Sequence, residues 1–294
     1  MDERERLTEQ FEEHRPRLRA VAYRMLGSVS EADDAVQDAW MRLDRADTDS
    51  VQNLGGWLTT VVARECLNLL RSRRRRHEES LGVHVPDPII GHQDGVDPEH
   101  EALLADSVGL ALMVVLGTLT PAERLAFVLH DLFAVPFEEI ATVVERSPAA
   151  TRQLASRARR RVREQGPAPD PDLTGQREVI DAFFAASRDG DFDALVAVLD
   201  PDIVLRSDGG LARPQMNMLL RGAQAVAQQA FTSGRLSPFV RPALVNGAAG
   251  VVVAPQGRPQ FVMAFTVVHA RVVAIDVLAD PERLRRLDLA VLDD

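Results

Sequence analysis

Arginines carry the clearest chemical potential in this chain, and they gather in two short segments. All 34 basic residues are arginine, because the sequence contains no lysine. Six arginines and one glutamate lie between Arg64 and Arg76, and six arginines without an acid lie between Arg152 and Arg163. Arginine donates planar, bidentate hydrogen bonds to phosphate and to guanine. The net charge of −10 argues against indiscriminate coating of nucleic acid, so the two segments predict two localised anion contacts.

The second segment is expected to form the recognition helix of a helix-turn-helix motif. Ser147-Pro148 predicts its start, and a short amphipathic helix over 137–144 precedes it across a tight turn. At about 100° per residue, one side of the helix is apolar. The opposite side carries Arg152, Gln153, Ser156, Arg160 and Arg163. The first two suit base edges. Phosphate contacts are expected from Arg157, Arg160 and Arg161. A solvated amphipathic helix explains the pattern equally well.

The first segment lies on a predicted helix over 56–76. Its polar stripe consists of Arg64, Asn68, Arg71 and Arg75, and Arg73 to Arg76 extend the positive charge towards phosphates. Trp57 falls on this stripe rather than on the apolar face. An outward indole can stack on an unpaired base, or it can pack beneath the preceding loop over 53–55, and both possibilities stay open.

An acidic helix from Glu31 has the opposite charge. Asp34 and Asp38 lie four residues apart on one face, beside Glu31 and Asp33. The repulsion between them would be relieved by a basic partner surface, and a solubilising face is the alternative. Ser30 is expected to cap this helix.

The chain is expected to divide into three domains joined by two linkers. The predicted domains are 1–80, 102–165 and 176–294, and the linkers are 81–101 and 166–175. The first two domains show helical spacing of apolar residues, whereas the linkers are rich in proline, glycine and acid. The third has two short helices, then valine-rich strands interrupted by one helix. This pattern predicts an α+β domain with a curved sheet and helices on one side.

Three stretches of the chain resemble a known family. RLRAVAYRMLGSVSEADDAVQDAWMRL (17–43) and GGWLTTVVARECLNLLRSRRRR (55–76) resemble region 2 of a bacterial sigma factor of the extracytoplasmic-function type. LTPAERLAFVLHDLFAVPFEEIATVVERSPAATRQLASRARRRVRE (119–164) resembles the region 4 helix-turn-helix of that family. The remainder resembles the SnoaL-like extension of one branch. The resemblance implies a multidomain fold: an all-α region 2 bundle, an all-α region 4 helix-turn-helix and an α+β SnoaL-like (NTF2-like cone) domain.

The resemblance also implies partners and residue roles. The partners are core RNA polymerase and promoter DNA. Polymerase contact is expected from Asp33, Asp34, Gln37 and Asp38. Contacts to the minus-ten element are expected from Trp57, Arg64, Asn68, Arg71, Arg73, Arg74 and Arg75. Contacts to the minus-thirty-five element are expected from Arg152, Gln153, Ser156, Arg157 and Arg160.

The C-terminal domain is expected to be a built-in regulator. The expected regulatory residues are Asp208, Gly209, Gly210, Asp280, Pro281, Arg283 and Leu284. Related extensions typically have a third glycine and an Asn-Pro-Asp-Lys-Leu type motif, where this chain has Leu211 and Ala-Asp-Pro-Glu-Arg-Leu over 279–284. The acidic domain could restrain the DNA-binding domains, or be displaced by polymerase or by a small-molecule ligand.

Two other functions stay open on sequence alone. One is a ligand-responsive helix-turn-helix regulator that binds duplex DNA without polymerase. The other is an enzyme, with acid–base candidates Asp202, Asp208, His269 and Asp276. No carboxylate and histidine have a spacing that demands catalysis, so no enzyme, cofactor or metal is expected. Lone Cys66 excludes a disulfide framework and a thiolate zinc site. A charged N-terminus and short apolar runs predict a cytoplasmic protein without membrane contact.

Overall fold

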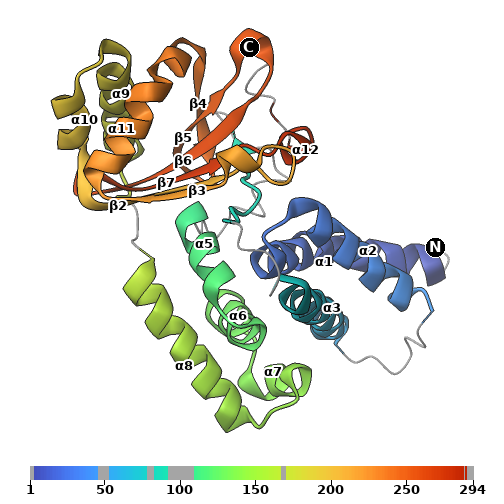
Figure 1. Cartoon of the computed structure of the whole chain (residues 1–294). Coiled ribbons are helices and arrows are strands. Elements are labelled where there is room, and N and C mark those ends of the chain that lie inside the picture. The colour runs from blue at the N-terminus through green and yellow to red at the C-terminus, as the bar shows by residue number, and fades with distance from the viewer. Residues whose placement is uncertain are drawn as a thin grey trace. The chain divides into compact units, whose positions relative to one another are not determined.

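The structure is a computed structural model that describes residues 3–45, 53–77, 83–91, 109–166, 170–287 and 289. The chain divides into two compact units. The first unit comprises residues 1–81, 101–106 and 115–165, and the second comprises 82–100, 107–114 and 166–294. Figure 1 labels their elements. Within the described residues, every helix is too short or too polar to cross a membrane.

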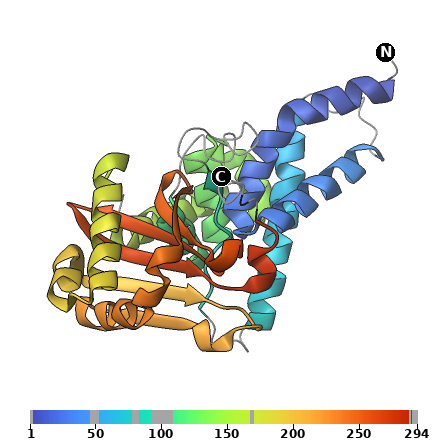
Figure 2. The ribbon, with the colours of Figure 1, turned by 90° about the horizontal axis from the view of Figure 1, so that it is seen from above.

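Three long helices begin the first unit: α1 (Glu3–Leu26), α2 (Val29–Leu43) and α3 (Leu54–His77). They pack against one another, as the blue to cyan ribbons of Figures 1 and 2 show. Their buried side chains include leucine, valine and methionine. Gly27, at φ 73°, ends α1 as a left-handed glycine commonly does. One local expectation is wrong: the N-cap of α2 is Ser28 and not Ser30, because Ser30 already lies in the helix.

The helix-turn-helix follows from local capping. Before it come α5 (Leu110–Thr118), α6 (Pro121–Phe127) and the π-helical turn η2 (Val128–Leu132). Thr120 and Glu123 close a reciprocal capping box at the start of α6. The motif itself is α7 (Phe137–Val144) and α8 (Pro148–Gln165). The left-handed Glu145 ends α7, and the Ser147 hydroxyl accepts a hydrogen bond from the Ala150 N–H. The predicted motif is therefore confirmed.

One mixed sheet organises the second unit. Its strand order is β1-β4-β5-β6-β7-β2-β3, and among the described strands only the β2–β7 pair is parallel. The strands are β1 (Ile90–Gly91), β2 (Leu199–Asp208), β3 (Met218–Arg221), β4 (Val240–Val245), β5 (Ala248–Val253), β6 (Phe261–Val268) and β7 (Arg271–Leu278). The helices are α9 (Leu173–Asp189), α10 (Phe192–Val198), α11 (Ala223–Ser233) and α12 (Pro281–Leu284). Short turns η3 (Pro214–Met216), η4 (Gly234–Phe239) and η5 (Pro255–Gly257) complete it.

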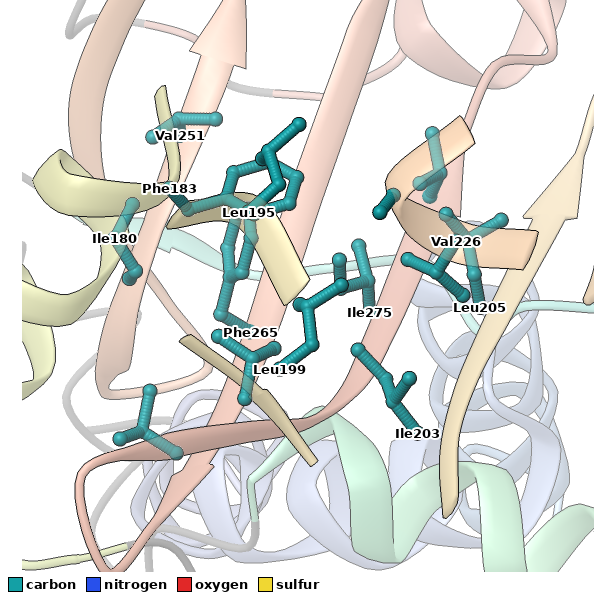
Figure 3. Close-up of a cluster of buried hydrophobic side chains, with 14 of the residues drawn as sticks. Ile180, Phe183, Leu195, Leu199, Ile203, Leu205, Val226, Val251, Phe265 and Ile275 are labelled. Atoms are coloured by element: carbon teal, nitrogen blue, oxygen red, sulfur yellow. The ribbon is translucent and has the colours of Figure 1, made fainter. Parts of the chain in front are cut away.

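Helices α9, α10 and α11 lie together on one side of the sheet (Figure 1). The core lies between them and the strands. In Figure 3, Phe183 and Leu195 from the helices meet Phe265 and Ile275 from the strands, and all four side chains are buried. Alternation along β2 turns Ile203 and Leu205 into this core. The predicted α+β domain is confirmed, although β1 and β3 were not predicted.

Candidate nucleic-acid interface and linker contact

The polar side of α8 is open to solvent. Its expected DNA-contacting residues, namely Arg152, Gln153, Ser156, Arg157 and Arg160, are all exposed. The opposite side is held by Thr151, Ala155 and Ala158, which are buried. Because the exposed residues share one side of one helix, they form a continuous arginine-rich surface.

Side chains from neighbouring helices fix part of this surface. The Arg152 Nη2 atom donates to Glu138 Oε1 at 2.8 Å, and its guanidinium lies 5.5 Å from the centroid of the Phe137 ring. The Arg161 Nη1 atom donates to the buried Glu123 at 3.1 Å. Arg161, which was expected to contact phosphate, is therefore part of the contact that holds α8 on α6. Arg152 is oriented, yet more than half of its side chain is exposed.

Helix α3 presents a second polar surface. Arg64, Asn68 and Arg74 are exposed, whereas Trp57 and Arg71 are half-buried. Trp57 is therefore neither fully internal nor fully outward. The side chain of Arg75 lies outside the described residues.

Arg73 has a different environment from the other predicted minus-ten residues. It forms an ion pair with Glu31 of α2 and donates to the Leu26 carbonyl oxygen at the end of α1, at 3.0 Å. Its guanidinium therefore ties α3 to both neighbouring helices.

The acidic surface of α2, like the polar surface of α3, combines exposed side chains with half-buried or paired ones. Asp34 and Gln37 are exposed and Asp38 is half-buried. Asp33 is exposed but accepts two hydrogen bonds from Arg19 of α1, at 2.5 and 3.2 Å. The remaining acidic groups thus form the part of α2 most available to a basic partner.

Buried cations lie where α1, α3 and α6 meet. Arg24 and Arg124 are almost fully buried, and the Arg124 Nε atom donates to the Arg24 carbonyl oxygen at 3.0 Å. Burial, with the nearby charge of Arg73, lowers the pKa of Arg124 to about 10. Burial likewise raises the pKa of the Cys66 thiol to about 12. The lone cysteine is thus a neutral core residue and not a reactive thiolate.

In the second unit, residues 83–91 form an extended segment that we call the strap (teal beside the sheet in Figure 1). Its residues 85–91 are all buried. At one end, the Val85 N–H donates to Asp208 Oδ2 of β2 at 2.9 Å. At the other end, Ile90–Gly91 pair antiparallel with β4, and Ile89 exchanges two hydrogen bonds with Asn246. The strap therefore crosses from β2 to β4, past three intervening strands.

Arg283 of α12 holds the middle of the strap. It donates to Asp87 Oδ1 at 2.6 Å, to the Val85 carbonyl oxygen at 2.5 Å and to Asp208 Oδ2 at 2.8 Å. Burial alone would raise the pKa of Asp208. Hydrogen bonds from His84 and the Val85 N–H, together with the charge of Arg283, outweigh burial and lower that pKa to about 2.

The two motifs predicted to regulate lie against each other. A Cβ atom on Gly210, at φ 61°, would meet Asp280 Oδ2 at 1.9 Å, and one on Gly209 would meet the Arg213 carbonyl oxygen at 2.2 Å. Glycine is therefore required at both positions by close approach. The Ala279 N–H donates to the Asp208 carbonyl oxygen at 2.7 Å. Motifs some seventy residues apart thus build one contact site. The strap residues His84, Val85 and Asp87 were not predicted to contact the C-terminal domain. The apolar-Pro-Asp-Pro-apolar sequence over 85–89 was the signal that could have identified them.

The acid–base candidates do not form a catalytic group. Asp202 and His269 are exposed, Asp208 belongs to the strap contact, and Asp276 is buried against Arg206. Burial raises the pKa of Asp276 despite the charge of Arg206. In the described part of the chain, no three histidine, cysteine or acidic side chains are arranged to hold a metal ion.

Comparison with known proteins identifies the family. The model for Sigma-70 region 2 matches residues 10–76, and the model for Sigma-70 region 4 matches residues 109–162. The ECF RNA polymerase sigma factor SigJ of Mycobacterium tuberculosis is 39% identical over 295 residues, which cover 93% of this chain and 92% of that protein. This chain belongs to the extracytoplasmic-function sigma factors.

Other matches agree with this family. The crystal structure of SigJ from Mycobacterium tuberculosis has a TM-score of 0.78 and 35% identity, and it covers 96% of this sigma factor and 99% of that chain. The sigma factor SigG of the same species is 28% identical over 239 residues, covering 73% of this chain and 63% of that protein. As a member of the family, the chain acts with core RNA polymerase at promoter DNA to initiate transcription. The ligand-responsive regulator acting without polymerase is not favoured.

Proposed function

We propose that α8 contacts the minus-thirty-five element, that α3 contacts the minus-ten element, and that the acidic face of α2 contacts core polymerase. Exposure of Arg152, Gln153 and Arg157 on one side of α8 supports the first role, because base edges and phosphates are then within reach. Exposed Arg64 and Asn68 support the second, and exposed Asp34 supports the third. The chain then acts in the cytoplasm and has no catalytic activity of its own.

We further propose that the C-terminal domain restrains initiation by holding the strap. The strap lies in sequence between the two segments that match region 2 and region 4, so whatever holds it limits the positions those domains can take. The single observation that carries this proposal is Arg283, which bridges strap residue Asp87 to sheet residue Asp208. Polymerase binding would then compete with the strap contact. The predicted small-molecule ligand of this domain stays a prediction.

Promoter-dependent transcription tests both proposals. Purified core polymerase, a cognate promoter template and the full chain should give specific transcripts, and Asp87→Ala should raise their yield because the strap is released. Arg258→Ala is the matched control, since Arg258 is an exposed residue of the same unit, at the end of the η5 turn. Equal yields from Asp87→Ala, Arg283→Gln and the unaltered chain would contradict regulation through the strap. Loss of transcripts in Gln153→Ala, without loss of polymerase binding, would support the role of α8.

A further inference from the structure

The strap is bound in the manner of a peptide ligand. Every hydrogen bond described for Val85 and Ile89 goes to Asp208, Asn246 or Arg283 of the C-terminal domain. Pro86 and Pro88 alternate with these residues and are buried, and proline has no N–H that burial would leave unsatisfied. Addition of β1 to the free edge of β4 is β-augmentation, a common way of recognising an extended peptide.

The groove that receives the strap is assembled from distant parts of the domain. Asp208 ends β2, Asn246 lies in the turn after β4, and Arg283 lies in α12. Together they select an extended segment with one carboxylate between two prolines and an apolar residue on either side. Leaving this groove empty would be costly, because the edge of β4 would lose its pairing with β1 and the buried Asp208 carboxylate would lose its bond from the Val85 N–H.

The geometry points to exchange of straps between two copies of this sigma factor. The inference rests on the proposed release of the strap, because only a released strap empties the groove. A second copy carries the one segment already shown to fit, and a reciprocal exchange closes with two-fold symmetry. Five residues separate α3 from the strap and 18 residues separate the strap from α5. The longer connection can span about 60 Å when extended and the shorter one about 20 Å, so a strap that reaches a neighbouring chain moves together with α3.

Two complementary variants test the exchange in the full chain. Asp87→Ala damages the strap and leaves the groove intact, whereas Arg283→Gln damages the groove and leaves the strap intact. Each variant alone should remain a monomer of 32.3 kDa. Mixed at about 100 µM, they should form a heterodimer in which the intact strap occupies the intact groove, detected by light scattering during gel filtration. Circular dichroism of each variant verifies that it is folded.

A fluorescent peptide of residues 83–91 tests the groove directly. It should bind Asp87→Ala about tenfold or more tighter than the unaltered chain, whose own strap competes at high effective concentration. It should not bind Arg283→Gln, and a peptide carrying Asp87→Ala should not bind any chain. Peptide binding without a heterodimer would overturn exchange between copies. Absence of peptide binding, or equal binding to Arg283→Gln, would overturn the groove itself. Neither measurement uses polymerase, so the transcription assay can fail or succeed independently.

Discussion

Two regions of this sigma factor use arginine in opposite ways. On α8, Arg157 and Arg160 face solvent, and Arg152 keeps an exposed side chain although it pairs with Glu138. In the strap contact, one mostly buried Arg283 bonds two carboxylates and a carbonyl oxygen. An exposed guanidinium can exchange water for a partner at little cost in free energy. A buried guanidinium destabilises the fold when it loses one of its partners. The first arrangement suits binding of an external polyanion, and the second suits holding the chain together.

The largest effect should follow from Arg283→Ala. This substitution leaves Asp208 buried without its cation, and breaking a buried pair typically costs about 3–5 kcal/mol. Hydrogen exchange at the Val85 and Ile89 amides should therefore accelerate strongly, while exchange in α8 stays unchanged. Arg258→Ala, which removes an exposed arginine of the same unit, should leave both regions as they are. Equal protection of the strap in the two variants would remove the contrast between buried and exposed arginines.

Acid should weaken the strap contact through Asp208. The folded pKa of about 2 is lower than the value near 3.9 of an unfolded aspartate, so the contribution is fully present above pH 4. This contribution is about 2–3 kcal/mol, and most of it is lost as the pH falls from about 4 to 2. The difference in free energy of unfolding between the unaltered chain and Asp208→Asn should shrink over that range. A difference independent of pH would mean that the contacts of Asp208 with His84, the Val85 N–H and Arg283 do not hold it ionised.

Much of the fold could be predicted because local signals and tertiary structure agree. The cap at Ser147 predicted the start of α8, and helical spacing predicted its buried face. Prediction failed where an element forms only through contacts with residues far away in the sequence. Strand β1 is two residues within a proline-rich segment, and only the edge of β4, some 150 residues away, makes it a strand.

In the candidate site, too, local patterns predicted exposure but not the contacts between helices. Exposure on α8 follows from periodicity, so its predicted DNA-contacting residues all lie on one open surface. Arg73 and Arg161 belong to the same charge runs, yet each bonds a glutamate of another helix. Periodicity cannot reveal such a partner, because it depends on how helices pack. Sequence motifs did identify Asp208 and Arg283, but not the strap that they hold.

Substitution on α8 should affect promoter selection without affecting folding. Arg152→Ala removes a side chain suited to bidentate contact with guanine, so discrimination among bases at one position of the minus-thirty-five element should fall by about 1–3 kcal/mol. Arg157→Ala removes the proposed phosphate contact, so it should weaken binding to all promoters and reduce the salt dependence of that binding. Promoter competition at two salt concentrations separates the two effects. Identical changes in both variants would indicate that α8 contributes charge alone.

The smallest effect should come from Arg73→Ala, compared with Arg64→Ala on the same helix. Arg73 bonds Glu31 and the Leu26 carbonyl oxygen, so its removal should lower the free energy of unfolding of the first unit by about 1–2 kcal/mol. Arg64 is exposed, and its removal should leave stability unchanged but weaken binding to melted minus-ten DNA. Both tryptophans of the chain, Trp40 and Trp57, lie in this unit, so tryptophan fluorescence in urea reports its unfolding separately from the second unit. If Arg64→Ala shifted that transition as far as Arg73→Ala, the distinction between a structural and a DNA-contacting arginine on α3 would fail.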